Sequence, residues 1–204
     1  MIIEEFKQYS NEYWAAKIGK PGSSSFDKIL TPKTMKPSTS AKNYAYTLAG
    51  ERITGVKIEG YQNSHMERGL ETEGEARELF EMLTDIEVKQ VGLIYPDERK
   101  LYLCSPDGLL MDDREGLEIK CPAIHTHVSY LLAGTIPRDY IPQVQGSMLI
   151  TGFSIWNFMS YYPGLPPLII KVKRDDKFCA ILKVELAAFC KTLDEVTEKI
   201  KGMG

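Results

Sequence analysis

Three short strand-like segments in the middle of the chain constrain its fold more than any other feature. They lie near residues 87–95, 101–111 and 116–121, and turn-forming residues separate them. Helical patterns precede them and return after them, and two further strand-like runs cover 154–162 and 168–172. This order suits an α/β or α+β sheet with helices on both faces. The first three segments are expected to form an antiparallel meander.

Residues typical of helix ends bound the helical segments. Ser10 is placed to cap a helix that ends at Gly19, and Ser40 is placed to start a second helix that ends at Gly55. Further helices are expected from Ser64 to about Leu83, over 125–134 and 138–151, and from about Phe178 or Val184 to Ile200. Residues 30–40 are rich in Pro, Ser, Thr and Lys, which favours an exposed mobile loop.

The composition predicts one soluble domain that covers residues 1–204. A chain of this length with 43% hydrophobic residues can bury a core, and it contains no repeat. No apolar run is long enough for a membrane span, and no export signal opens the chain, so a cytoplasmic protein is expected. The four cysteines lack any Cys-x-x-Cys spacing, which favours reduced thiols over a zinc ribbon.

The net charge of −3 hides an uneven distribution along the chain. Residues 1–60 carry nine Lys or Arg and six Asp or Glu, whereas the other 144 residues carry sixteen and twenty-two. If the protein contacts nucleic acid, the N-terminal third should therefore supply much of the positive field. The acidic remainder suits bound divalent cations.

One constellation of residues points to chemistry. The string CSPDGL at 104–109 is followed, after eight residues, by Glu118, Ile119 and Lys120. Side chains alternate along a strand, so Glu118 and Lys120 share one face and Ile119 points to the other. A hairpin of this length can bring the carboxylate of Asp107 beside Glu118. Two such oxygen ligands at a strand end predict a magnesium site.

A purely structural interpretation of the same residues competes with the functional one. Asp-Gly is a common hairpin turn, and Glu-x-Lys is an ordinary exposed strand face with a surface ion pair. Either piece alone is more often structural. The combination, with strand-type residues on both sides, favours the functional interpretation.

The combination resembles a known nuclease signature. Pro106-Asp107 followed by Glu118-x-Lys120 resembles the PD-(D/E)xK motif, and the strings CSPDGL, GLEIKCP and YIPQVQGSM are similar to the phage lambda exonuclease and YqaJ-type viral recombinase branch. The resemblance extends from about Trp14 to Tyr162. It implies a restriction-endonuclease-like α/β core, in which helices flank a central mixed β-sheet. It also implies an exonuclease that degrades one strand of linear duplex DNA from its 5′ end and leaves a 3′ overhang.

The resemblance assigns roles to the central residues. Asp107 and Glu118 match metal-binding carboxylates, with the backbone carbonyl of Ile119 as a further ligand. Two Mg²⁺ ions are implied, and Mn²⁺ is a possible substitute. Lys120 matches the lysine that orients or deprotonates the attacking water, and desolvation together with two cations is expected to lower its pKa.

Other positions match catalytic residues less specifically. Asp97 matches a further acidic residue needed for activity, or it is simply a turn residue. Glu73 matches an acidic residue on an early helix, or it belongs to a solvated helix face. Tyr140, Gln143 and Gln145 match a Q-x-Q helix beside the site. Because Gln143 and Gln145 do not share a helical face, at most one of them should point at the metals.

The resemblance also implies a pocket for the 5′-phosphate of the digested strand. Ser105 and Ser24 match two hydroxyl positions, and Lys17 falls near an arginine, so a point charge replaces a bidentate fork. A second expected arginine appears as Thr126, so that either phosphate affinity is lower or a flanking histidine substitutes. Met66 matches an apolar wedge that splits the terminal base pair, or it packs in the core.

Partners follow from the resemblance alone. It implies a ring-shaped homotrimer that threads double-stranded DNA ends, encoded by a phage or prophage and working in the bacterial cytoplasm with a single-strand annealing protein. Two alternatives stay open. One is a non-catalytic DNA-end-binding module of the same fold, against which the intact acidic pair and lysine argue. The other is an iron–sulfur nuclease, whose usual cysteine arrangement this chain does not match.

Overall fold

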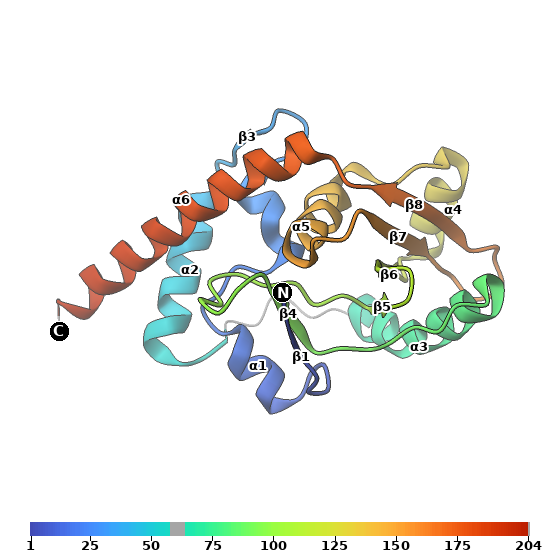
Figure 1. The fold of residues 1–204 in the computed structure, drawn as a ribbon, viewed down its shortest axis with the longest axis horizontal. Coiled ribbons are helices and arrows are strands. Elements are labelled where there is room, and N and C mark those ends of the chain that lie inside the picture. Colours follow the sequence, from blue (N-terminus) through green and yellow to red (C-terminus); the bar gives the residue numbers. More distant parts are fainter. Residues whose placement is uncertain (58–63, 204) are drawn as a thin grey trace.

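A four-stranded mixed sheet forms the centre of the protein (Figure 1). The computed structural model describes the backbone of residues 1–57 and 64–203 and the side chains of residues 1–57 and 72–203. The sheet order is β5 (Gly108–Leu110), β6 (Glu115–Lys120), β7 (Ile155–Ser160) and β8 (Leu168–Lys173). Strands β6 and β7 are parallel, and the two outer pairs are antiparallel. The predicted mixed sheet is confirmed.

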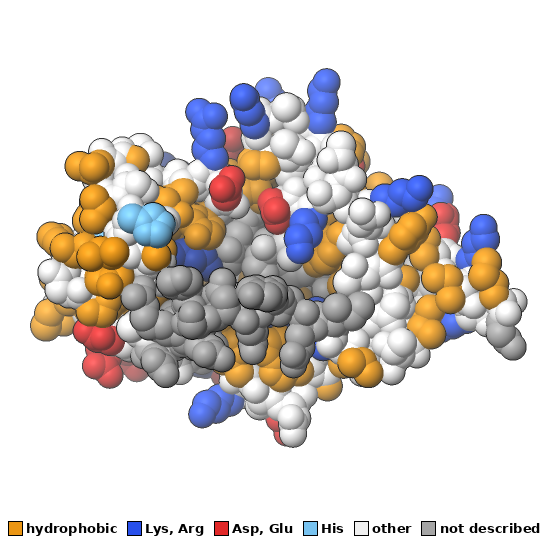
Figure 2. Space-filling view, turned by 180° about the vertical axis from the view of Figure 1, so that it is seen from behind, with side chains coloured by type: hydrophobic (Ala, Val, Ile, Leu, Met, Phe, Trp, Pro, Cys, Tyr) orange, Lys and Arg blue, Asp and Glu red, His pale blue; other side chains and the backbone are white. Residues whose placement is uncertain are grey.

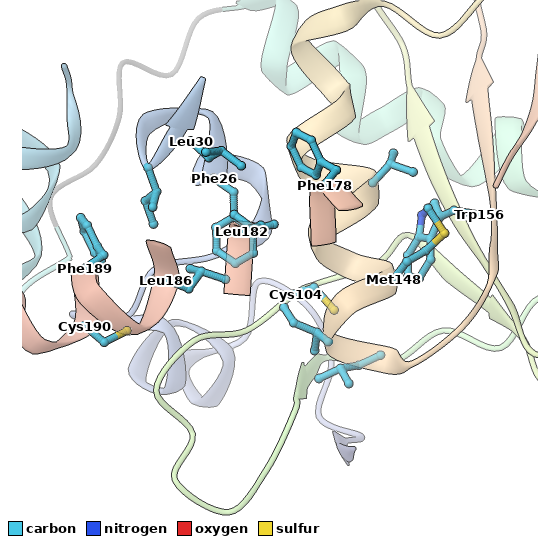
Figure 3. Packing of buried hydrophobic residues seen from close by; sticks show 14 of the residues in the cluster. Phe26, Leu30, Cys104, Met148, Trp156, Phe178, Leu182, Leu186, Phe189 and Cys190 are labelled. Carbon is cyan, nitrogen blue, oxygen red and sulfur yellow. The ribbon is translucent and has the colours of Figure 1, made fainter. Parts of the chain in front are cut away.

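Helices cover both faces of this sheet. Helix α3 (Ser64–Thr84) packs its buried Phe80 in one cluster with Leu117 and Ile119 of β6. Helix α5 (Ile141–Thr151) packs Met148 in a larger cluster with Trp156 of β7 (Figure 3). Because neighbouring strand residues point to opposite faces, Glu118 lies on the α5 side of β6.

The remaining elements extend the larger cluster away from the sheet. Helix α6 (Asp176–Lys201) lies along α2 (Ala41–Thr54) at one end of the molecule, as Figure 1 shows. Phe189 of α6 stacks on Tyr44 of α2, with 5.4 Å between ring centroids. The other elements are β1 (Ile2–Glu4), α1 (Asn11–Lys17), a 3₁₀ segment (Ser23–Lys28), β2 (Leu30–Thr31), β3 (Lys36–Pro37), β4 (Leu93–Tyr95), α4 (Ile124–Ala133) and a second 3₁₀ segment (Arg138–Tyr140).

The predicted helix boundaries have clear physical causes in the structure. Ser10 caps α1, because its side chain accepts a hydrogen bond from the backbone N–H of Tyr13 at 3.2 Å. Gly55 ends α2 in a left-handed conformation at φ 69°, which glycine adopts without strain. The last helix begins earlier than expected, because Asp175 caps it through the N–H of Phe178.

Of two expectations about the strands and loops, one is confirmed in part and the other is wrong. The predicted meander forms in part. Residues 87–95 pair antiparallel with 101–111 at two bridges, Lys89 with Leu109 and Ile94 with Cys104, and β5 pairs with β6, but β4 also pairs with β1 from the N-terminus. The segment 30–40 is not a structureless loop, because it contains the short β2–β3 hairpin. Both differences reflect pairing that local residue patterns do not specify.

The four cysteines are free thiols, as their spacing predicts. Cys104, Cys179 and Cys190 are buried. None of the helices in the described part of the chain has the length and apolar character that spanning a lipid bilayer requires.

Candidate active site

The β5–β6 hairpin places Asp107 against the strand that carries Glu118. The backbone N–H of Asp107 donates to the carbonyl of Leu117 at 3.1 Å, in register with the antiparallel pair that follows. The Oδ2 atom of Asp107 accepts the backbone N–H of Ile119 at 2.6 Å. The carboxylate therefore lies directly beside the peptide unit between Glu118 and Ile119, as the spacing predicts.

Glu118 is a buried carboxylate with one unsatisfied oxygen. Its side chain is 2% exposed, and its Oε1 accepts hydrogen bonds from Lys120 Nζ and from Gln143 Nε2. Its Oε2 has no hydrogen-bond partner among the described residues. Buried polar atoms in folded proteins are rarely left unpaired, so this oxygen calls for a ligand. A divalent cation is a ligand that fits a carboxylate oxygen.

Three carboxyl groups in the site have raised pKa values. Burial raises the pKa of Glu118, and the charge of Asp107 raises it further. Burial also raises the pKa of Asp107 and that of Glu73. The charge of Asp107 raises the pKa of Glu73 further. Carboxyl groups whose pKa is raised by burial and by neighbouring carboxylates gain stability when a cation neutralises them.

The carboxylates beside Lys120 raise its pKa in the protein itself. Burial alone would lower the pKa of Lys120, but the carboxylates of Glu118 and Asp107 outweigh it and raise the pKa above its ordinary value. The ammonium also lies over the ring of Tyr140, with Nζ 5.3 Å from the ring centroid. Lys120 is therefore a protonated hydrogen-bond donor in the protein itself.

The donor set suits a hard cation that keeps water ligands. No group of three or more His, Cys, Asp or Glu side chains within the described residues is arranged to hold a metal. Asp107 and Glu118 supply two carboxylates. Ile119 follows Glu118 in β6, and its backbone N–H donates to Asp107. Magnesium commonly binds through one or two carboxylates and several waters, whereas structural zinc and iron–sulfur clusters need four strong ligands. The residues therefore fit magnesium.

Helix α3 adds an acidic and a basic side chain to the site. Glu73 accepts a hydrogen bond from Arg77 at 2.6 Å, and Arg77 Nε donates to the backbone carbonyl of Asp107 at 3.0 Å. Glu73 thus belongs to the cluster, as the resemblance implies. Arg77 was not among the residues predicted from the sequence, although its i, i+4 spacing from Glu73 is a usable signal.

The two glutamines face different partners. Gln143 reaches Glu118, whereas Gln145 donates to the backbone carbonyl of Lys173 at 3.0 Å and accepts the N–H of Asp175. Only Gln143 points at the acidic cluster, which agrees with the helical-face argument. Gln145 instead ties α5 to the segment between β8 and α6.

A second polar group lies on the α1 side of the acidic cluster. Lys17 Nζ donates to the hydroxyl of Tyr13 at 2.8 Å, and that hydroxyl donates to Ser105 Oγ at 3.1 Å. Ser105 in turn donates to the carbonyl of Gly92 at 3.0 Å. Burial lowers the pKa of Lys17 to about 8, and the positive charge of Lys57 contributes to this lowering. These side chains form a chain of hydrogen bonds from Lys17 to Ser105, which lies two residues before Asp107.

Lys57 is a second cation near Lys17 that the sequence analysis missed. Its ammonium contacts both oxygens of Glu51, at 2.9 and 3.1 Å, and Glu51 is 1% exposed. Glu51 also accepts the backbone N–H of Gly19 at 3.0 Å, just beyond α1. A lone lysine after a helix end carries no sequence signal, because only the tertiary approach of α1 and α2 gives it a place.

The family can be decided from the match along the chain. Residues 12–154 match the family model of the YqaJ-like viral recombinase domain, which is well over half of the chain. The chain belongs to the YqaJ-like viral recombinase family. No curated protein matches it.

Solved structures support this membership in the YqaJ-like family. The chain is similar to an alkaline exonuclease, LHK-Exo, from Laribacter hongkongensis, with 32% sequence identity, a TM-score of 0.85, and coverage of 95% of this chain and 97% of that one. The structure of LHK-Exo in complex with dAMP gives the same values. A phage-related exonuclease from Haemophilus somnus 129PT has 16% identity, a TM-score of 0.71 and coverage of 89% and 96%, which shows the fold alone. The fold is thus the restriction-endonuclease-like α/β core.

Two further positions matched to the YqaJ-like pattern lie in a turn and in the first 3₁₀ segment. Asp97 lies in the turn after β4, where its side chain is 42% exposed and pairs with Arg99 at 2.8 Å. A role for Asp97 in activity stays a prediction. Ser24 is exposed on the first 3₁₀ segment, close to Gly22, which bridges to Leu103.

The remaining candidates are a histidine pair and Met66. His127 is buried, and its ring nitrogens contact Ser160 Oγ at 2.8 Å and the carbonyl of Pro166 at 3.0 Å. It therefore packs as a satisfied core residue, while His125 is exposed on α4. The backbone of Met66 lies in α3, but its side chain falls outside the described residues.

Proposed function

We propose that this YqaJ-like protein is a magnesium-dependent exonuclease that degrades one strand of linear double-stranded DNA from its 5′ end and leaves a 3′ overhang. The convergence of Asp107, Glu118 and Lys120, with one oxygen of Glu118 left without a partner, is the observation that carries this proposal. The similarity to a solved alkaline exonuclease at 32% identity supports the reaction class. The 5′ polarity and the overhang rest on the family resemblance.

The residues have distinct tasks in this proposal. Asp107, Glu118 and the carbonyl of Ile119 would hold Mg²⁺, which supplies positive charge beside the scissile phosphate and acidifies a bound water. Two ions are proposed, with Mn²⁺ as a substitute. Lys120, which donates a hydrogen bond to Glu118, orients the attacking water or takes its proton. Gln143 and Tyr140 hold Glu118 and Lys120 in place.

The second polar group is proposed to bind the 5′-phosphate of the digested strand. Lys17, Tyr13 and Ser105 present an ammonium and two hydroxyls along one connected path, and Lys57 adds positive charge nearby. The negative charge of a terminal phosphate would pair with the ammonium of Lys17, and its oxygens would accept hydrogen bonds from the hydroxyls. The buried contacts of His127 argue against that histidine as a phosphate ligand.

The partners in this proposal are DNA ends, two further copies of the chain and a single-strand annealing protein. The description of the family as viral recombinases supports a phage or prophage origin, with action in the bacterial cytoplasm. Figure 2 shows hydrophobic side chains gathered over α4, where Ile124, Val128 and Leu132 are 50%, 39% and 85% exposed. An apolar stripe of this kind is a surface that subunit contacts commonly cover.

Digestion of end-labelled duplexes tests polarity and chemistry together. Wild-type protein with Mg²⁺ should release a 5′ label early as a mononucleotide and leave a 3′ label on a long strand. Lys120→Ala should slow this release by about 100-fold or more, because the group that positions the nucleophile is gone. Lys183→Ala, an exposed lysine on α6, is the matched control and should match the wild-type rate.

Early release of the 3′ label would contradict the proposed polarity. Wild-type activity in Lys120→Ala would remove Lys120 from the chemistry, and binding of ends without any cleavage would favour the non-catalytic alternative.

Lys17→Ala should weaken the preference for a 5′-phosphate. We expect the ratio of rates on phosphorylated and unphosphorylated ends to fall by about 10-fold, because one charge-assisted contact is lost. Since burial lowers the pKa of Lys17 to about 8, the ammonium is lost as the pH rises through that value, so the wild-type preference should also fade above about pH 8. Lys20→Ala removes a nearby positive charge and is the control. An unchanged ratio in Lys17→Ala would show that Lys17 does not bind the phosphate.

A further inference from the structure

Tyr9 holds an unfavourable backbone conformation at the edge of the acidic cluster. Its φ angle is 65°, in the left-handed region that a residue with a bulky side chain rarely adopts. Tyr9 is nevertheless 46% exposed, so burial of this residue does not account for the conformation. Such strain persists where the surrounding structure imposes it, and it occurs often at binding sites.

Contacts on both sides of Tyr9 impose this conformation. The side chain of Gln8 donates to the backbone carbonyls of Val91 and Pro106, at 2.9 and 2.8 Å. On the other side, Ser10 caps helix α1. Pro106 directly precedes Asp107, so the anchor of Gln8 fixes the position of Tyr9 relative to the metal-binding carboxylate.

The ring of Tyr9 is supported on one side by other aromatic rings. Its centroid lies 5.5 Å from the ring of Tyr13 and 6.0 Å from that of Trp14, in tilted arrangements. These contacts hold the ring without covering it. A rigid, half-exposed aromatic ring with a fixed orientation is suited to stack with a planar ligand group.

Tyr9 also lines a cavity that reaches the acidic cluster. The cavity has a volume of about 580 Å³, and its walls include the segment 5–9, Glu73 and Arg77 of α3, and Asp107. This volume falls in the range of sites that bind a small organic ligand. A group bound against Tyr9 therefore lies in the same cavity as the carboxylate that is proposed to bind the metal.

We propose that Tyr9 stacks with a nucleobase of the digested strand, in one of the two nucleotides that flank the scissile phosphate. This inference rests on the proposed exonuclease function and names the base-binding surface of that same site. A nucleotide with its phosphate at Asp107 and Glu118 can place its base in the adjoining cavity, where Tyr9 offers a face. Stacking is tolerant of sequence, as an exonuclease that digests any sequence requires.

A thermodynamic cycle between the protein and the DNA tests this contact. Binding is measured by fluorescence anisotropy of a 5′-phosphorylated duplex in Ca²⁺, so that cleavage is not needed for the readout. The duplex carries either normal bases or an abasic site at the first or second nucleotide of the digested strand. Tyr9→Gly removes the ring and suits the left-handed backbone, while Tyr9→Phe keeps the ring. Tyr46→Ala removes a tyrosine of similar exposure, 49%, from α2 and is the matched control.

The expected result is a non-additive loss. Tyr9→Gly should weaken binding of the normal duplex by about 10-fold, and the abasic site at one of the two positions should weaken binding to wild type by a similar factor. The two changes together should cost little more than either alone, and Tyr9→Phe and Tyr46→Ala should bind like wild type. Additive losses at both positions, or wild-type binding by Tyr9→Gly, would overturn the proposal. If the losses are non-additive but wild-type protein does not cleave DNA ends in Mg²⁺, the base contact stands and the nuclease function is refuted.

Discussion

Asp107→Asn is expected to lower the rate of Mg²⁺-dependent cleavage by about 1,000-fold or more while the protein stays folded. Asp107 is one of the two carboxylates that we propose to hold the ion, so its neutralisation would remove several kcal/mol of charge stabilisation in the transition state. The hairpin should survive, because the side-chain carbonyl of an asparagine can still accept the N–H of Ile119.

Metal binding provides a readout for this variant that is independent of activity. A ligand that binds only the folded state raises the melting temperature as its concentration rises. Wild-type protein should therefore melt at higher temperature as Mg²⁺ is added, and Asp107→Asn should show little of this rise. Asp113→Asn makes the same chemical change at the exposed turn of the same hairpin and should behave as wild type in both assays. Equal Mg²⁺ stabilisation of wild type and Asp107→Asn would show that Asp107 is not a metal ligand.

The central part of the site could be predicted from the sequence because its geometry is local. Asp107, Glu118 and Lys120 belong to one hairpin, where side-chain alternation and a short connection determine which groups meet. The caps at Ser10 and Gly55 were predictable for the same reason, since each depends on residues within one helical turn.

The parts that could not be predicted depend on contacts between distant segments. Strand β4 pairs with β1, about ninety residues earlier in the chain, which is a partner that the expected meander did not include. Lys57 gains its place only when α2 approaches the end of α1, through Glu51 and Gly19. No local pattern encodes either approach.

The lowered pKa expected for Lys120 beside two bound cations stays a prediction, and the structure shows which neighbouring charges oppose it. The sequence indicated burial and bound cations, which both lower the pKa of a lysine. The structure adds Glu118 and Asp107 as close anionic neighbours, and their charge outweighs desolvation in the protein itself. A pKa depends on the full set of neighbouring charges, which a spacing motif supplies only in part.

Trp156→Ala is expected to have the largest effect on stability, lowering the free energy of unfolding by about 3–5 kcal/mol. Trp156 is fully buried on β7, opposite Gly116 of the neighbouring strand β6. Loss of the indole removes a large buried apolar surface and leaves a cavity beneath the strand that carries Glu118. Denaturant unfolding measures the change, and Leu132→Ala, at an 85% exposed site, should change the free energy by less than about 0.5 kcal/mol.

A second substitution at Gly116 shows whether the indole is the cause of this effect. A Cβ atom added at Gly116 would lie 2.4 Å from the Trp156 ring, too close for an unstrained contact. Gly116→Ala alone should therefore destabilise the protein by about 1–3 kcal/mol through overpacking. In the Trp156→Ala background the same methyl group enters the new cavity, so its cost should disappear or become a small gain. Additive losses in the double variant would show that the two residues do not press on each other, and that the glycine in β6 is required for some other reason than the tryptophan beneath it.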